Sequence, residues 1–205
     1  MTSYTHAAVD NLLLKLMDCG VGGVDNRNRD GTSDLVRIGQ KSSCHTGVHC
    51  IMASHLACEI DRSEAAQNDG KGTIRPSKAH VNIYHKSDKP SSQSLHRVVS
   101  GAKIVGVSAL TIPKSPLLVG QHFDVVIVDE AGQISQPAIL GPLIAADSFV
   151  LVGDHEQLPP LVQSDSADQA GMSKHYLEFL KKLFILSFSH SQIFYFILQA
   201  SVYQC

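Results

Sequence analysis

The sequence predicts an α/β fold, in which helices flank a parallel sheet. Residues 125–128 and 149–152 are runs of four large or β-branched apolar residues without alternation. Such runs are typical of strands that are buried on both faces. The first run leads into Asp129 and Glu130, and the second leads into Asp154. Because ligands bind beyond the carboxyl ends of strands in open α/β sheets, the two acidic tips should border one crevice.

An amphipathic helix is predicted over residues 7–17. Its apolar residues recur at helical spacing; they are Val9, Leu12, Leu13, Leu16 and Met17. Thr5 is the expected N-cap and Gly20 the expected stop. Asp10, Asn11, Lys15 and Asp18 fall on the opposite face, with Leu14 as the exception.

Further elements follow from the same patterns. Strands are expected over 35–38 and 103–107, and helices over 48–60, 137–145 and 172–182, with a break at Gly141-Pro142 as an alternative. Residues 60–97 are polar and contain several Gly and Pro breakers, which predicts a disordered insertion. We therefore expect a partial domain over 1–182, followed by an apolar tail over 183–205.

The overall composition restricts the functional classes. The net charge of −2 and the pI near 6.6 exclude a globally basic surface, so a nucleic-acid site would have to be local. Five cysteines without a secretory leader favour a reducing compartment. Cys44, Cys50 and Cys58 lie near three histidines, but without a C-x2-C pair the spacing matches no common zinc finger. Metal binding there stays an open alternative.

The tail includes a stretch long enough to cross a bilayer. Residues 183–202 contain no Lys, Arg, Asp or Glu. Serine, histidine and glutamine residues interrupt the stretch, so a membrane helix is not favoured. A membrane-tethered protein remains an alternative.

The two acidic tips carry the chemistry. Asp129-Glu130 after an apolar strand is the Walker B pattern, in which the aspartate holds Mg²⁺ and the neighbouring carboxylate orients water. In the second tip, Gln157 on a Pro-stiffened loop could sense a γ-phosphate. The simpler alternative for the first tip is a pair of solvated acids at a turn.

The order of these motifs is similar to that of a known family. D-E-A-x-Q at 129–133 and G-D-x-x-Q-L-P-P at 153–160 resemble motifs II and III of superfamily 1 helicases, and residues 2–20 resemble motif Ia. The chain looks closest to the eukaryotic DNA replication ATP-dependent helicase/nuclease type. The resemblance implies a partial RecA-like P-loop NTPase domain. It also implies a nuclear, or also mitochondrial, ATP-dependent helicase of DNA replication and repair that moves 5′ to 3′ on single strands.

The resemblance also implies roles by position. Asp129 would bind Mg²⁺, Glu130 would be the catalytic base, and Gln133 would lie near the nucleotide. Gln157 would sense the γ-phosphate, and Asp154 would support its loop. The implied single-stranded DNA contacts are Thr5, His6 and Ser108. Gly132 departs from the family, which usually carries Ser or Thr there. ATP and Mg²⁺ are the implied cofactors, replication and repair proteins the implied partners, and the iron–sulfur cluster of the family would lie outside this fragment.

One family motif is missing. The sequence contains no G-x-x-x-x-G-K-[ST], which would cradle the phosphates. We therefore expect a fragment that is truncated at both ends, in which Met1 is an internal methionine and the tail fits no family continuation. Alone it should hydrolyse little ATP. The alternatives are a catalytically inactive remnant that binds single-stranded nucleic acid, and an RNA helicase of the same superfamily.

Overall fold

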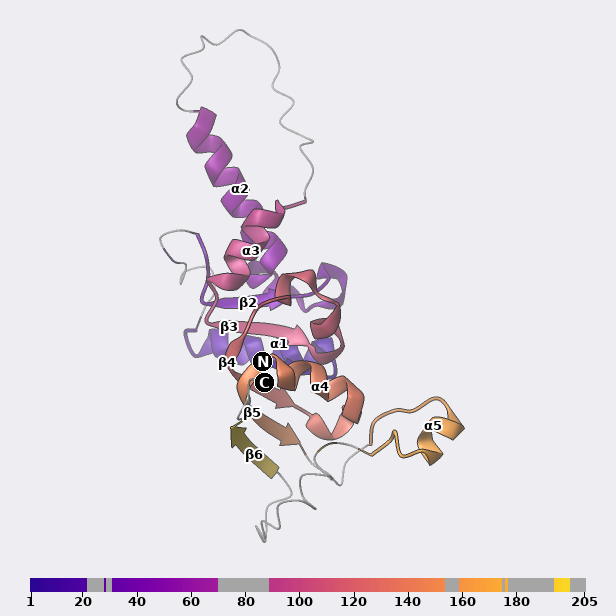
Figure 1. Ribbon diagram of the computed structural model, residues 1–205. Coiled ribbons are helices and arrows are strands. Elements are labelled where there is room, and N and C mark those ends of the chain that lie inside the picture. Colours follow the sequence, from indigo (N-terminus) through magenta and orange to yellow (C-terminus); the bar gives the residue numbers. More distant parts are fainter. Residues whose placement is uncertain are drawn as a thin grey trace, which may run out of the picture.

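The computed structural model describes residues 1–21, 28, 31–69, 89–153, 159–174, 176 and 194–199. These residues form a sheet with the strand order β2-β3-β1-β4-β5-β6 (Figure 1). Five strands are parallel, and β6 pairs with β5 in the antiparallel direction. The strands are β1 (Thr2–Ser3), β2 (Leu35–Ile38), β3 (Ile104–Ser108), β4 (Phe123–Asp129), β5 (Ala146–Gly153) and β6 (Phe194–Gln199). The predicted parallel α/β architecture is confirmed.

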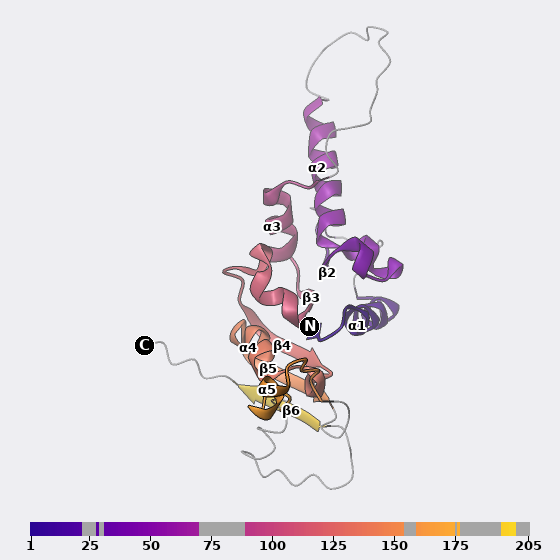
Figure 2. The same cartoon turned by 90° about the vertical axis from the view of Figure 1, so that its right-hand side faces the viewer.

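Helices cover both faces of the sheet. They are α1 (His6–Asp18), α2 (Ala53–Asp69), α3 (Ser92–Ser100), α4 (Gln136–Ile144) and the short α5 (Asp165–Gln169). Figure 2 shows α1 on the opposite side of the sheet from α3 and α4. Helix α1 packs very closely on β3, because a Cβ added at Gly106 would lie 2.6 Å from a Leu13 methyl group. Glycine at this position therefore sets the distance between helix and sheet.

The first helix follows its prediction except at one residue. Thr5 is the N-cap, and its hydroxyl oxygen accepts a hydrogen bond from the Ala8 amide at 3.2 Å. Gly20, with φ of 83°, ends the helix. Asp10, which helical periodicity places on the polar face, is nevertheless buried, with 1% of its surface exposed. Its carboxylate is buried because it pairs with an arginine on β2, a contact that helical periodicity alone does not reveal.

The helix expected over 48–60 is wrong at its start. The chain forms a 3₁₀ helix, η2 (Thr46–Ile51), and α2 begins only after Met52. Met52 adopts extended backbone angles, φ −67° and ψ 136°, which interrupt the helical hydrogen bonds. Its backbone bridges to Arg37 on β2, so pairing with the strand competes with a continuous helix.

The disordered insertion expected over 60–97 is wrong at both ends. Helix α2 continues to Asp69, and α3 begins at Ser92. Asp61 joins them, because its carboxylate accepts hydrogen bonds from the Ser91 amide at 2.7 Å and from the Ser94 hydroxyl at 2.6 Å. Arg97 adds an ion pair with Glu64 at 2.8 Å. Residues 70–88 lie outside the described part of the chain.

The second half follows the prediction closely. Strands β4 and β5 extend the predicted apolar runs, and β3 is shifted by one residue from the predicted 103–107. Two 3₁₀ helices, η3 (Ala109–Lys114) and η4 (Pro116–Leu118), fill the proline-rich segment. Helix α4 continues through Gly141-Pro142 without a break. Of the helix expected over 172–182, residues 172–174 are not helical, and only Tyr176 of the remainder is described.

One prediction about burial fails. Strand β4 was expected to be buried on both faces, but Val125 is 50% exposed. Val126 and Val128, which point to the other face, are buried. One side of β4 therefore faces a space that none of the described elements fills.

Candidate nucleotide and nucleic-acid site

The parallel register places the predicted site residues at one edge of the sheet. Ser3 at the end of β1 lies opposite Ser108 of β3 on one side and Asp129 of β4 on the other. Val128 lies opposite Leu151, so β5 ends at the same edge. The carboxyl ends of four neighbouring strands thus meet there, which is where open α/β sheets bind ligands.

Asp129 has the environment of a Mg²⁺ ligand. It is half-buried at the tip of β4, and one carboxylate oxygen accepts a hydrogen bond from the Glu130 amide at 3.0 Å. This bond fixes the carboxylate, while its second oxygen could contact a cation. Mg²⁺ commonly uses one or two protein carboxylates and completes its shell with water and phosphate. Asp129 therefore fits the ion that the sequence implies.

Glu130 has an unusual backbone conformation. Its φ of 52° and ψ of 39° make it the one non-glycine residue with positive φ among the described residues. This left-handed conformation is uncommon for a non-glycine residue and clusters at functional sites. It turns the chain sharply after β4 into η5 (Ala131–Gln133), and the Gln133 amide donates to the Glu130 carbonyl at 2.9 Å. The chain therefore leaves the direction of β4 immediately after Asp129.

The three predicted DNA contacts differ in accessibility. Thr5 is exposed at the start of α1. His6, the next residue, is half-buried. Ser108 is buried, and its hydroxyl shares a hydrogen bond with the Thr111 hydroxyl at 2.7 Å. Ser108 therefore clamps the turn into η3, whereas Thr5 and His6 are presented to solvent.

Sequence reasoning missed Arg37, the residue that orders the His6 side chain. Arg37 is fully buried, and its guanidinium donates to Asp10 at 2.6 Å, to the Ile38 carbonyl at 2.7 Å and to His6 Nδ1 at 3.1 Å. A guanidinium can only donate, so His6 Nδ1 must accept and the ring proton lies on Nε2. His6 thus carries one further N–H donor on the opposite edge of its ring.

The same network extends to a second segment. The other Asp10 oxygen accepts a hydrogen bond from the His45 amide at 2.6 Å. Asp10 therefore ties η2 and α1 to β2 through one buried carboxylate. An apolar run around an arginine, as in residues 35–38, was the signal available in the sequence, since a buried arginine requires a buried acid.

The sequence analysis also missed the side-chain hydroxyls of Thr2 and Ser3. Thr2 and Ser3 are fully buried in β1, and neither side-chain oxygen has a hydrogen-bond partner among the described residues. Ser3 lies in register with Ser108 and Asp129, so its side chain points to the same face of the sheet as theirs. Its hydroxyl is a further polar group near the crevice.

Part of the predicted site lies outside the residues that the structure describes. Asp154 and Gln157 lie outside the described residues, so the second acidic tip stays a prediction.

Among the described residues, no three His, Cys, Asp or Glu side chains gather into a metal site. Burial raises the pKa of the Cys44 thiol, opposed by the nearby charge of Arg37. In the same part of the chain, no helix is long and apolar enough to cross a membrane.

A family model and the most similar curated proteins point to the same kind of protein. A family model described as an AAA domain matches residues 59–165. The DNA replication ATP-dependent helicase/nuclease JHS1 of Arabidopsis thaliana is 37% identical over 174 residues, which cover 84% of this chain and 10% of that protein. The helicase/nucleases DNA2 of Xenopus laevis and Homo sapiens are 36% and 34% identical over 182 residues, which cover 89% of this chain and 14% and 13% of theirs. The chain thus spans 10 to 14% of the length of these relatives, and the resemblance predicted from the motifs is confirmed.

Proposed function

The chain belongs to the AAA-domain family, and from this premise we propose that it forms the Mg·ATP- and DNA-contacting part of an ATP-dependent DNA helicase. The observation that carries the proposal is the register of β1, β3 and β4, which aligns Ser3, Ser108 and Asp129 at one sheet edge. The names of the relatives favour DNA replication as the process, and hence the nucleus as the compartment.

The geometry supports distinct roles at the acidic tip. Asp129 would hold Mg²⁺, which offsets charge on the nucleotide phosphates. Glu130, at the left-handed turn directly after Asp129, would accept a proton from the attacking water. Gln133 would contact the nucleotide, while Asp154 and Gln157 would report the presence of the γ-phosphate. The D-E-A-x-Q box is also the reason to propose 5′-to-3′ movement for this helicase type.

The start of α1 would contact the DNA backbone. The amides of the first helical turn and the Nε2–H of His6 are donors that suit phosphate oxygens. The Thr5 hydroxyl accepts from Ala8 and can still donate its own proton. These contacts do not distinguish bases, as expected for a protein that moves along single strands.

A second function has its own support. The 205 residues contain no G-x-x-x-x-G-K-[ST], so the phosphate cradle and its lysine are absent from the sequence. Phosphoryl transfer depends on such charge stabilisation. We therefore propose that this chain alone hydrolyses little ATP and acts as a single-stranded nucleic-acid-binding unit. Phosphate release that rises with single-stranded DNA and is lost in Glu130→Gln would contradict this.

The test of DNA contact is binding of fluorescent oligo(dT), measured by anisotropy at low salt. We expect His6→Ala to weaken binding about 3- to 10-fold, the loss of one or two phosphate contacts. Asp124→Asn is the matched control, because this exposed acid lies near the opposite end of β4 from Asp129. Equal binding by wild type and His6→Ala would reject the α1 contact.

The same binding assay with added Mg·ATP distinguishes the helicase function from the binding function. Mg·ATP should shift oligo(dT) affinity if the crevice binds nucleotide, and Asp129→Asn should remove that shift. No response to Mg·ATP with intact DNA binding would leave only the binding function. Tighter binding to oligo(U) than to oligo(dT) would favour an RNA helicase instead.

A further inference from the structure

Ser3 carries a buried hydroxyl at the edge of the sheet where the strand ends meet. The residue is fully buried in β1, and its hydroxyl oxygen has no hydrogen-bond partner among the described residues. Buried hydroxyls are nearly always paired, because an unpaired one keeps the full cost of losing its contact with water. An unpaired hydroxyl at the edge where such sheets bind ligands therefore needs a functional explanation.

The register of the sheet places Ser3 between two polar side chains. Ser108 of β3 and Asp129 of β4 lie directly opposite Ser3, one on each side, and all three side chains point to the same face of the sheet. The Ser108 hydroxyl already shares a hydrogen bond with the Thr111 hydroxyl. The Asp129 carboxylate accepts a hydrogen bond from the Glu130 amide and has the capacity to accept more. Asp129 is therefore the acceptor that suits the Ser3 hydroxyl.

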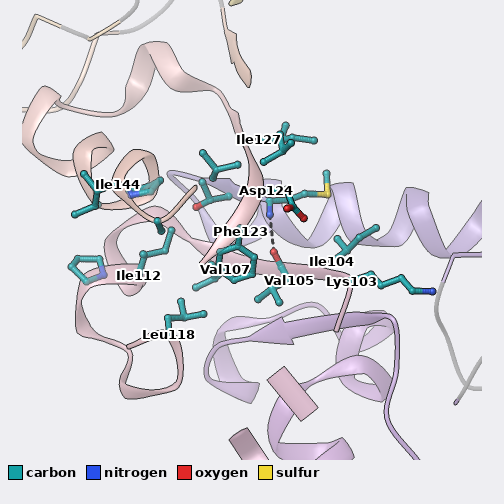
Figure 3. A pocket seen from close by; sticks show the side chains of 18 of the residues that line it. Lys103, Ile104, Val105, Val107, Ile112, Leu118, Phe123, Asp124, Ile127 and Ile144 are labelled. Carbon is teal, nitrogen blue, oxygen red and sulfur yellow. Dashed lines mark hydrogen bonds between the residues drawn. The ribbon is translucent and has the colours of Figure 1, made fainter. Parts of the chain in front are cut away.

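Backbone pairing holds Ser3 at a fixed distance from Asp129. On the amino-terminal side of Ser3, the Met1 amine donates to the Val105 carbonyl at 2.7 Å, drawn in Figure 3, and the Met1 carbonyl accepts from the Val107 amide at 3.1 Å. The backbones of neighbouring strands lie about 4.8 Å apart. Across this spacing, a change of side-chain rotamer brings a serine hydroxyl within hydrogen-bond distance of a carboxylate oxygen.

We propose that Ser3 is a positioning residue for the metal ion, and that its hydroxyl donates a hydrogen bond to the Asp129 carboxylate when this carboxylate binds Mg²⁺. Carboxylates that bind metal ions are themselves held by hydrogen bonds from neighbouring groups, and loss of such a bond weakens metal binding. The Ser3 hydroxyl orients the carboxylate so that one oxygen faces the ion. The inference rests on the role proposed above for Asp129.

Thr2 provides a matched comparison on the other face of β1. Its hydroxyl is equally buried and likewise has no hydrogen-bond partner among the described residues. The residues directly opposite Thr2 are Val107 and Val128, whose side chains cannot accept a hydrogen bond. Thr2 also lines an apolar cavity of about 600 Å³, and Figure 3 shows Val107 and Phe123 on its wall. Thr2 therefore matches Ser3 in burial but pairs with apolar residues instead of a carboxylate.

The test is a titration of the full chain with Mn²⁺, which replaces Mg²⁺ as a paramagnetic probe. Binding is measured by NMR from the broadening of the amide signals of residues 129–133. We expect Ser3→Ala to weaken Mn²⁺ binding about 10-fold. Thr2→Val should leave the affinity within about twofold of the wild-type value. Equal Mn²⁺ affinities of the wild type and Ser3→Ala would overturn the proposal.

Thermal unfolding separates the positioning role from a structural one. Ser3→Ala removes an unpaired buried hydroxyl, so its Tm should equal or slightly exceed that of the wild type. A lower Tm with unchanged Mn²⁺ affinity would assign the hydroxyl to the stability of the fold and reject the positioning role.

Asp129→Asn shows which of the two proposals fails. If Asp129→Asn abolishes the broadening and Ser3→Ala does not weaken it, only the role of Ser3 is wrong. If Asp129→Asn leaves the broadening unchanged, the ion does not bind at Asp129, and the proposed metal site is wrong together with the role of Ser3.

Discussion

The buried Arg37–Asp10 pair has the largest predicted effect of any single substitution. Arg37→Met leaves the Asp10 carboxylate buried without its ionic partner, and this should lower the free energy of unfolding by about 3 to 5 kcal/mol. The double variant Arg37→Met with Asp10→Asn removes both charges and should recover at least half of the loss. Urea unfolding of the wild type, the two single variants Arg37→Met and Asp10→Asn, and the double variant measures this coupling. Additive losses would show that the pair is not coupled.

Arg37 also determines the form of His6. With the guanidinium donating to Nδ1, the imidazole should be the neutral Nε2–H tautomer in the wild-type protein. Long-range ¹H–¹⁵N NMR of the ring at pH 7.5 reads this directly, without a destabilising mutation. Detection of Nδ1–H as the main species would exclude the hydrogen bond and, with it, the orientation that we propose for DNA contact.

The connection between α2 and α3 depends on Asp61. Three hydrogen bonds reach its carboxylate, and those from Ser94 and Ser91 hold its pKa below the usual value. Asp61→Asn should lower Tm by about 2 to 4 °C near neutral pH. Because the depressed pKa stabilises the fold only while Asp61 is ionised, this difference should shrink as pH falls below about 4.

Thermal unfolding at pH 7 and at pH 3 measures that prediction. Arg62→Gln is the matched control, since Arg62 is an exposed charged residue of the same helix. A Tm difference for Asp61→Asn that is as large at pH 3 as at pH 7 would contradict the carboxylate as its origin.

Among the helices and strands, sequence patterns predicted best those that depend on local interactions. The apolar runs of β4 and β5 and the cap of α1 are visible in short windows. The elements that were missed depend on distant residues. Helix α2 is held by contacts from α3 about 30 residues later, and Met52 is held extended by its bridge to β2. Periodicity carries no information about either contact.

In the candidate site, too, residues in local sequence patterns could be predicted, whereas residues that depend on distant partners could not. The position of Asp129 and Glu130 at the end of a strand could be predicted, because a strand followed by two acids is a local pattern, and the register of the sheet places Asp129 at the shared edge. Ser108 was assigned to the correct edge, but its bond with Thr111 could not be anticipated. Arg37 and Ser3 were missed, because each gains its role only from a partner or register that the fold creates.

For the whole molecule, the Met1 amine predicts how stability depends on pH. Its pKa falls from 8.0 to about 6 on folding, so the unfolded chain binds more protons between these values. Stability should therefore rise from pH 6 to pH 8, by about 2 kcal/mol after allowance for the half-exposed Met1 residue.

The comparison is urea unfolding of the native and N-acetylated chains at pH 6, 7 and 8, with Met1 verified by mass spectrometry. Acetylation should flatten this part of the pH profile, because it removes the charge and keeps an N–H for the Val105 carbonyl. Identical slopes for the two chains would show that the amine is solvated in the folded protein.

The position of β1 also has a kinetic consequence. This strand lies in the interior of the sheet, yet its partners on β3 and β4 follow more than 100 residues later, and the Met1–Val105 bond closes a loop of 104 residues. Such distant contacts raise the entropy cost of the folding transition state and slow folding. The first residues of the chain should thus be among the last to pair, and the edges of β3 and β4 stay exposed to aggregation until they do.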